Sequence, residues 1–158
     1  MRIQKLAGLN IIVLTLFIVD RILKYYFLKN PAGWPGGVFI SGWLNFELER
    51  NYGIAFGLPL GGRVLMFAVA MIIFILVGYL IKSFQKNDSL MVLALALIIA
   101  GAASNLIDRL RFGFVVDYIN VPWFTVFNLA DGAITFGVGL AIVKLWFKDK
   151  KAAALDSH

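Results

Sequence analysis

Length, composition and charge place this chain among membrane proteins. Of its 158 residues, 61% are hydrophobic and only 15% are charged, whereas typical soluble domains are about 45–50% apolar and about 25% charged. There are no cysteines, and the single histidine is the last residue, His158. These counts exclude disulfides, thiolate metal sites and the Ser-His, Cys-His and HExxH catalytic arrangements. We therefore expect no metal and no other cofactor.

The net charge of +6 does not indicate a nucleic-acid partner. The basic residues cluster at the ends of apolar segments, which membrane topology explains better. The length fits one integral membrane domain that covers residues 1–158.

Four apolar segments predict four transmembrane helices, at about residues 6–28, 64–83, 90–107 and 127–147. The middle two each contain an uncharged run of 18 residues, which suits a helix crossing a hydrocarbon core of about 30 Å. No small-x-small cleavage site follows the first segment, so we interpret it as a retained helix. The small residues in "GAAS", 101–104, predict a close helix-packing surface.

The distribution of basic residues predicts the orientation of the chain. With a cytoplasmic amino terminus, eight of the fifteen Lys and Arg residues lie inside and five lie in the outer segments. The inner loops are also shorter, so both termini are expected in the cytoplasm.

The two outer segments, about 29–63 and 108–126, contain strand patterns. In "WLNFELER", Leu44, Phe46 and Leu48 alternate with polar residues, and this period of two predicts a half-buried strand. A second strand-like piece is "FGFVVDYI". The predicted fold is thus an all-α membrane protein with a small extracytoplasmic β-sheet on the membrane surface.

Two carboxylates have apolar neighbours: Asp117 in "GFVVDYI" and Asp131 in "FNLADGAITFG". Both flank the loop between the third and fourth predicted helices, so they lie on the same side of the membrane in either orientation. Two carboxylates that share an apolar site cannot both ionise comfortably, so one keeps a proton near neutral pH. The charged one can then act as a base and the neutral one as an acid, as in aspartic proteases. The residues alone do not say which is which.

Simpler interpretations exist for each polar residue. Either Asp could pair with a cation, and Arg109 and Arg111 are candidates. Asp20 and Lys24 stand four apart near the outer end of the first helix, so we expect a structural ion pair.

The polar residues near the helix ends have two interpretations each. Asn105 and Asp108 share a helix face, and they either support the carboxylate pair or cap the helix end. Asn128 either caps the fourth helix alone or also orients Asp131. Asn51 and Gly53 in "RNYGIAFG" indicate a tight turn, and a grip on an extended peptide is a hypothesis.

The chain resembles the bacterial lipoprotein signal peptidases, the type II signal peptidases, which are membrane aspartyl proteases. The resemblance covers nearly the whole chain and rests on five blocks in the expected order. These are Asp20 with Lys24; Asn51, Gly53, Ala55 and Phe56 in "NYGIAFG"; Asn105, Asp108 and Arg109 in "NLIDR"; Val116, Asp117 and Ile119 in "GFVVDYI"; and Asn128, Ala130 and Asp131 in "FNLAD". The chain departs from the pattern at Ser104, where Gly is usual, and at Gly132, where Ser is common.

The resemblance implies that Asp117 and Asp131 are the catalytic pair. The residues expected to bind substrate or to support this pair are Asn51, Gly53, Asn105, Asp108, Arg109, Asn128 and Ala130. The substrate would be a prolipoprotein whose cysteine carries a diacylglyceryl group, cleaved just before that cysteine in the cytoplasmic (inner) membrane. The resemblance also implies inhibition by globomycin. We further expect a monomer with membrane lipid around it and the active site near the outer face.

Three rival classes make different predictions. A small four-helix proton- or cation-coupled transporter would carry its charges near the bilayer midplane. A scaffolding membrane protein would not need paired Asp residues. Another class of intramembrane aspartyl protease would show "GxGD", which neither "NLAD" nor "FVVD" matches.

Overall fold

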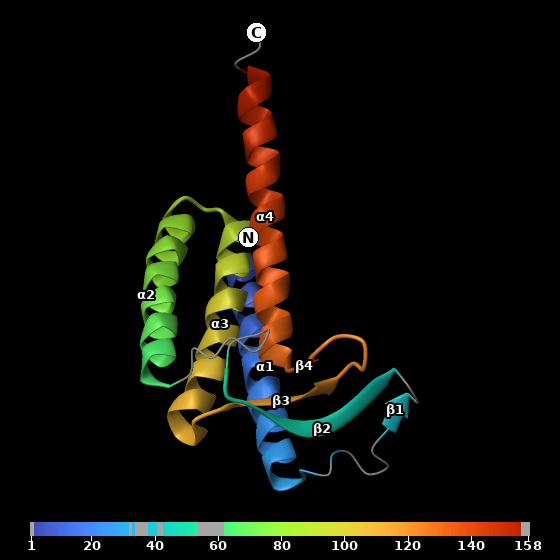
Figure 1. The fold of residues 1–158 in the computed structure, drawn as a ribbon. Coiled ribbons are helices and arrows are strands. Elements are labelled where there is room, and N and C mark those ends of the chain that lie inside the picture. Colours follow the sequence, from blue (N-terminus) through green and yellow to red (C-terminus); the bar gives the residue numbers. More distant parts are fainter. Residues whose placement is uncertain (1, 32, 34–37, 41–42, 54–61, 156–158) are drawn as a thin grey trace.

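A computed structural model describes all residues except 1, 32, 34–37, 41–42, 54–61 and 156–158. In the described part, four helices and four strands follow in the order α1 (Arg2–Lys29), β1 (Val38–Ile40), β2 (Leu44–Asn51), α2 (Arg63–Gln85), α3 (Ser89–Phe112), β3 (Val115–Asn120), β4 (Val126–Phe127) and α4 (Leu129–Leu155). Figure 1 shows α1, α3 and α4 running side by side, with α2 against α3 and the sheet at the end of the bundle opposite the two termini.

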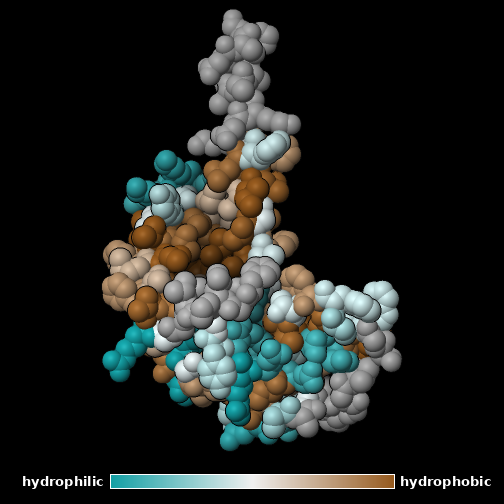
Figure 2. Space-filling model, viewed as in Figure 1, coloured by the Kyte–Doolittle hydropathy of each residue, from teal (hydrophilic) through white to brown (hydrophobic). Residues whose placement is uncertain are grey.

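Three of the four helices are long and apolar enough to cross a membrane: α2, α3 and the part of α4 from Leu129 to Phe147. Among the described residues three candidate spans are therefore found, where the sequence predicts four. Hydrophobic side chains cover much of the helical surface, whereas hydrophilic ones gather around the sheet (Figure 2). On α2, Phe67 and Phe74 are more than 70% exposed, as expected of a lipid-facing helix.

The helices extend beyond their predicted ends, and the largest difference that affects the site is in α3. The predicted end at residue 107 is wrong by five residues, because α3 continues to Phe112. It stops where Gly113 adopts a left-handed conformation, φ 81°, and donates its N–H to the carbonyl of Arg109. Asp108 and Arg109 are therefore part of the helix and not of the outer segment. α4 begins at Leu129, two residues later than predicted, and continues beyond residue 147.

The strands form one antiparallel sheet in the order β1-β2-β3-β4. The two strand patterns in the sequence predicted β2 and β3 correctly, and both glutamates of β2 are exposed as its alternation requires. Residues Val115 to Tyr118 of β3 are buried. The ring of Phe27 on α1 stacks on Tyr118 of β3 with centroids 4.9 Å apart, so the sheet packs against α1.

Close contact between α3 and α4 depends on glycine. A Cβ atom on Gly101 would collide with the carbonyl oxygen of Ala130, and one on Gly137 would lie 2.7 Å from the carbonyl oxygen of Ala94. The small-residue surface predicted at residues 101–104 is therefore the α3–α4 contact at Gly101. Ser104 in the same stretch has a polar function as well, because its hydroxyl donates to Asp20 at 2.6 Å.

The glycine contact generates a stability prediction. Gly101→Ala places a methyl group against backbone that must shift, so it should destabilise the protein by about 1–3 kcal/mol. The matched control is Gly139→Ala on α4, where nothing lies within 4 Å of the added Cβ and helix propensity should increase stability by about 0.5–1 kcal/mol. Thermal unfolding in detergent measures both variants. Equal melting temperatures would show that the close approach is not needed.

Candidate active site

The buried amino terminus of α4 brings the candidate residues together. Its N–H groups all have partners: Leu129 donates to the Tyr118 hydroxyl (3.1 Å), Ala130 to Asp20 (3.1 Å) and Asp131 to the Asn128 side-chain oxygen (2.9 Å). Buried helix ends require such partners. Side chains from α1 and β3 therefore hold this end of α4, and the first turn of the helix has one defined position.

Asp131 lies in the first turn of α4 and closes a reciprocal cap with Asn128. The Asn128 side chain accepts from the Asp131 N–H, and the Asp131 carboxylate accepts from the Asn128 N–H at 3.2 Å, which is a capping box. The other carboxylate oxygen accepts from the side-chain N–H of Asn105 at 2.7 Å. α3 and α4 thus both hold Asp131.

Asp117 lies in the buried part of β3, and its side chain is also held by amides. Its two oxygens accept from Asn51 at 2.9 Å and from Asn128 at 2.6 Å. Asn128 therefore contacts both acidic residues and also donates to the Asn105 oxygen at 3.2 Å. Of the two interpretations of Asn128, the structure supports the wider one, because this residue caps α4 and also joins Asp131 to Asp117.

The surroundings of Asp117 favour its neutral form. Burial and, next, the nearby charge of Asp131 raise the pKa of Asp117 to about 7. The amides of Asn51 and Asn128 and the charge of Lys24 oppose this effect only in part. Near neutral pH the protonated and charged forms of the Asp117 side chain are therefore both populated.

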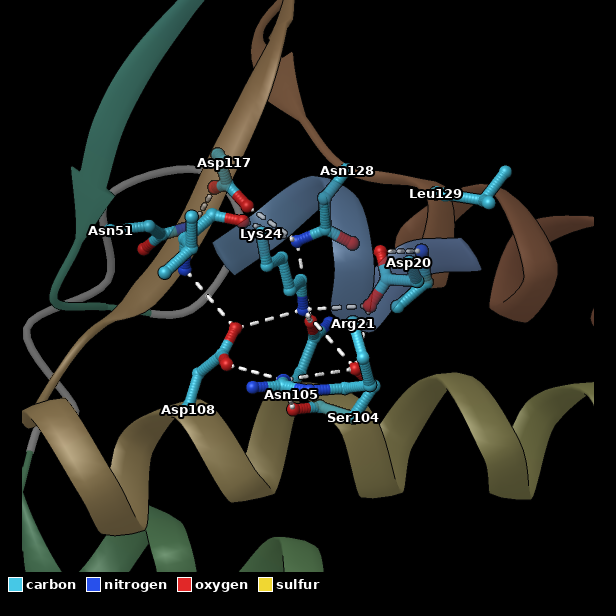
Figure 3. A network of polar contacts seen from close by, with 12 residues as sticks. Asp20, Arg21, Lys24, Asn51, Ser104, Asn105, Asp108, Asp117, Asn128 and Leu129 are labelled. Atoms are coloured by element: carbon cyan, nitrogen blue, oxygen red, sulfur yellow. Dashed lines mark hydrogen bonds and ion pairs between the residues drawn. The ribbon is translucent and has the colours of Figure 1, made fainter. Parts of the chain in front are cut away.

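A cluster of charged residues lies near Asp117 (Figure 3), and its Lys24 contacts Asn105, the residue that donates to Asp131. Lys24 contacts Asp20 at 3.2 Å and Asp108 at 2.8 Å, and Arg21 contacts Asp108 at 2.5 Å. The Asp20–Lys24 contact expected at i,i+4 is present, and it belongs to this larger cluster. Besides these two cations, Asp108 accepts from the N–H of Val116 at 3.3 Å. Among the described hydrogen bonds, none joins Asp108 to Asp117 or Asp131.

Sequence reasoning missed three members of this network: Arg21, Ser104 and Tyr118. Arg21 adjoins Asp20 in the sequence, and Ser104 stands one residue before Asn105, so adjacency to the proposed blocks was the available signal. Tyr118 directly follows Asp117 in "GFVVDYI" and had the same signal. Burial and the neighbouring Asp20 carboxylate raise the pKa of Tyr118, so its hydroxyl keeps its proton and donates to Asp20 at 3.3 Å.

The remaining candidates take up separate positions. Arg109 donates to the carbonyl of Gly53 at 2.8 Å, and among the described residues no salt bridge joins it or Arg111 to either candidate Asp. The interpretation that each Asp simply pairs with an arginine is therefore wrong for this part of the chain. Ala130 is buried and contributes its N–H to Asp20. Ala55 and Phe56 lie outside the described residues.

A cavity of about 620 Å³ opens beside these residues. Its polar lining includes Asn51, Asn105, Arg109 and Asp131, and its apolar lining includes Phe124, Phe127 and Phe136. Asp117, only 1% exposed, adjoins the cavity through Asn51, whose amide it binds. Large apolar pockets with a few convergent polar groups are the usual form of a binding site.

The fold and the site define a class of protein, a membrane enzyme. The chain is similar to a solved bacterial membrane enzyme with a TM-score of 0.77 and 32% sequence identity, over 91% of this chain and 90% of that one. A second solved bacterial membrane enzyme gives a TM-score of 0.71 at the same identity, over 88% and 92% of the chains.

Sequence comparison identifies the family. The family model for signal peptidase (SPase) II matches residues 12–147. The chain is 34% identical to the lipoprotein signal peptidase of Halothermothrix orenii, over 89% of this chain and 96% of that protein. It is 40% identical to that of Syntrophomonas wolfei, over 87% and 91%. The chain belongs to the signal peptidase II family, and it is a peptidase.

The site predicts a titration that spectroscopy can follow. Because the pKa of Asp117 is raised to about 7, its protonated carboxyl should persist through mildly acidic pH and disappear as the pH rises through 7. Infrared difference spectra of the carboxyl C=O stretch, with Asp117→Asn as the reference, measure this. Titration of the Asp117 band at its ordinary value of about 4 would contradict the raised pKa.

Proposed function

We propose that this chain is an aspartyl endopeptidase of the bacterial cytoplasmic membrane that removes the signal peptide from diacylglyceryl-modified prolipoproteins, with Asp117 and Asp131 as its catalytic pair. The main observation behind this proposal is that Asn128 donates hydrogen bonds to both carboxylates, from its backbone N–H to Asp131 and from its side chain to Asp117, beside a large cavity. The relatives are peptidases and do not support the alternative, a small four-helix transporter.

The two carboxylates are proposed to divide the chemistry. Asp131, at the positive end of the α4 dipole, stays ionised and takes a proton from a water molecule. That water's oxygen forms a bond to the scissile carbonyl carbon. Asp117, still protonated, donates a hydrogen bond to the carbonyl oxygen as it becomes negative. When the tetrahedral intermediate collapses, the C–N bond breaks and the leaving nitrogen receives the proton held by the pair.

The lining of the cavity suits an extended lipopeptide. Asn51 and Arg109 offer N–H groups to peptide carbonyls, and Gly53 holds Arg109 beside the cavity. The aromatic residues of the lining suit the apolar side chains before the cleavage site or the acyl chains after it. Asn105, Asn128 and Ala130 are proposed to support the pair, and Asp108 to support it through the charged cluster.

We also propose the arrangement of the chain in the membrane. All four helices span the bilayer in one integral domain, with both termini in the cytoplasm and the carboxylate pair near the outer face. Trp43 and Trp123 at the sheet end are at least 70% exposed, which suits side chains at the lipid–water interface. A sheet lying on that surface would hold the lipid-anchored cysteine at the depth of the pair. The protein is proposed to act as a monomer.

Neutralising either carboxylate should stop the reaction. Asp117→Asn and Asp131→Asn keep the shape of the side chain but remove the acid or the base, so each should lower kcat by at least about 10²- to 10⁴-fold. Both variants should insert and purify folded, which thermal unfolding checks. Turnover at the wild-type rate in either variant would remove that residue from the mechanism.

The substrate class has its own test. The purified enzyme should cleave a diacylglyceryl prolipoprotein and leave its unlipidated form intact, since only the lipidated cysteine is held at the membrane surface. Globomycin should block the cleavage. Equal cleavage of both forms would contradict the proposed substrate.

The proton shared by the pair predicts the pH dependence. The pKa of Asp117 is raised to about 7, so the singly protonated pair exists below that pH and is lost as pH rises through it. The rate should therefore fall by about tenfold per pH unit on the alkaline side, with an apparent pKa that belongs to the pair. A rate still rising at pH 9 would be incompatible with a protonated Asp117.

A further inference from the structure

Lys24 reaches the proposed catalytic site from the charged cluster. Its side chain has no exposed surface, and its ammonium contacts residues of α1 and α3 (Figure 3). Two of its contacts are the ion pairs to Asp20 and Asp108. The shortest contact, at 2.7 Å, goes instead to the side-chain oxygen of Asn105, which is the residue whose N–H holds Asp131.

This contact decides which way the Asn105 amide points. An ammonium has three donors and no acceptor, so the Asn105 atom that faces Lys24 must be the oxygen. The nitrogen then faces Asp131 and donates to it at 2.7 Å. If the amide turned over, its oxygen would meet a carboxylate oxygen, and the two would repel each other.

We infer that Lys24 is a positioning residue for the reaction: through the side-chain oxygen of Asn105 it fixes the N–H that orients Asp131. The inference rests on the proposed function, and it assigns Lys24 more than the structural ion pair expected from the sequence. Lys24 thus fixes the Asn105 N–H that donates to Asp131, and it does so without a described contact of its own to Asp117 or Asp131.

A purely structural role explains the contacts of Lys24 less well than the positioning role does. Without Lys24, Asp108 would keep Arg21 and the Val116 N–H. Asp20 would keep three donors, the hydroxyls of Ser104 and Tyr118 and the N–H of Ala130. The Asn105 oxygen would keep only the longer contact to Asn128, at 3.2 Å. The group that loses most is therefore the one that touches Asp131.

The charge of Lys24 also acts on the pair. It lowers the pKa of Asp117, against the effect of burial. Removal of this charge makes protonation of the carboxylate pair easier, so the whole pH–rate profile should move to higher pH. The charged and titratable groups around Lys24 are Asp20 and Arg21 from α1, Asp108 from α3, Asp117 and Tyr118 from β3, and Asp131 from α4.

The test compares Lys24→Met with Arg21→Met in the full-length enzyme acting on a diacylglyceryl prolipoprotein. Both variants remove one positive charge from the same cluster, but Arg21 contacts Asp108 and Ser104 and not Asn105. Lys24→Met should lower kcat by about 10- to 100-fold, the range typical of residues that orient the groups of an active site. KM should stay unchanged and the pH–rate profile should move to higher pH, whereas Arg21→Met should lower kcat by a smaller factor and should leave the profile close to wild type.

A double-mutant cycle tests whether Lys24 acts through Asn105. In an Asn105→Ala background, Lys24→Met should lower kcat no further, because the group it positions is already gone. Melting temperatures of all variants are measured in parallel. If Lys24→Met does not fold, the charge-balanced Lys24→Met/Asp108→Asn variant, with Asp108→Asn alone as its control, carries the same comparison.

Two results would overturn the inference. One is equal loss of kcat in the Lys24 and Arg21 variants, in proportion to their loss of stability. The other is a loss that adds to that of Asn105→Ala. A wild-type enzyme that leaves the lipidated substrate intact would instead overturn the proposed function, so the two failures are distinguishable.

Discussion

The site depends on one constraint, the need of the buried amino terminus of α4 for hydrogen-bond partners. The N–H groups that begin a helix have no partners within it, and here they are buried or half-buried. Asp20 from α1, Tyr118 from β3 and Asn128 just before the helix supply them. These partners come from three parts of the chain, so the hydrogen bonds they make bring α1, β3 and α4 together at the start of α4. Asp131 lies there, in the first turn of the helix.

Four carboxylates surround this junction, three of them buried and Asp131 half-buried, and they have two kinds of neighbour. Asp20 and Asp108 contact cations, Lys24 and Arg21. Loss of either carboxylate would take an ion-pair partner from Lys24, a cation with no exposed surface. These two residues therefore act as fixed anchors for α1 against α3 and α4.

The other two carboxylates, Asp117 and Asp131, are held by neutral amides of asparagine and by backbone N–H groups. Amides stabilise a carboxylate without adding charge, so a proton can arrive or leave without disrupting an ion pair. In the proposed function, this difference suits Asp117 and Asp131 to acid–base chemistry better than Asp20 and Asp108. In the proposed arrangement Lys24 connects the two groups, since it pairs with the anchors and holds the amide that binds Asp131.

The sequence by itself determined the membrane class, the approximate spans of the helices, the strands β2 and β3, and the family blocks. Apolar run length and alternation are local properties, and they survive folding because burial in lipid or against a sheet requires them. The i,i+4 spacing of Asp20 and Lys24 likewise predicted their contact. Only the tertiary structure decided the partners over long range. Arg21 reaches Asp108 across 87 residues and Ala130 reaches Asp20 across 110, and Asn128 bridges the pair only because β3 returns beside α4. Such contacts depend on how the helices and β3 pack against one another, which no local pattern specifies.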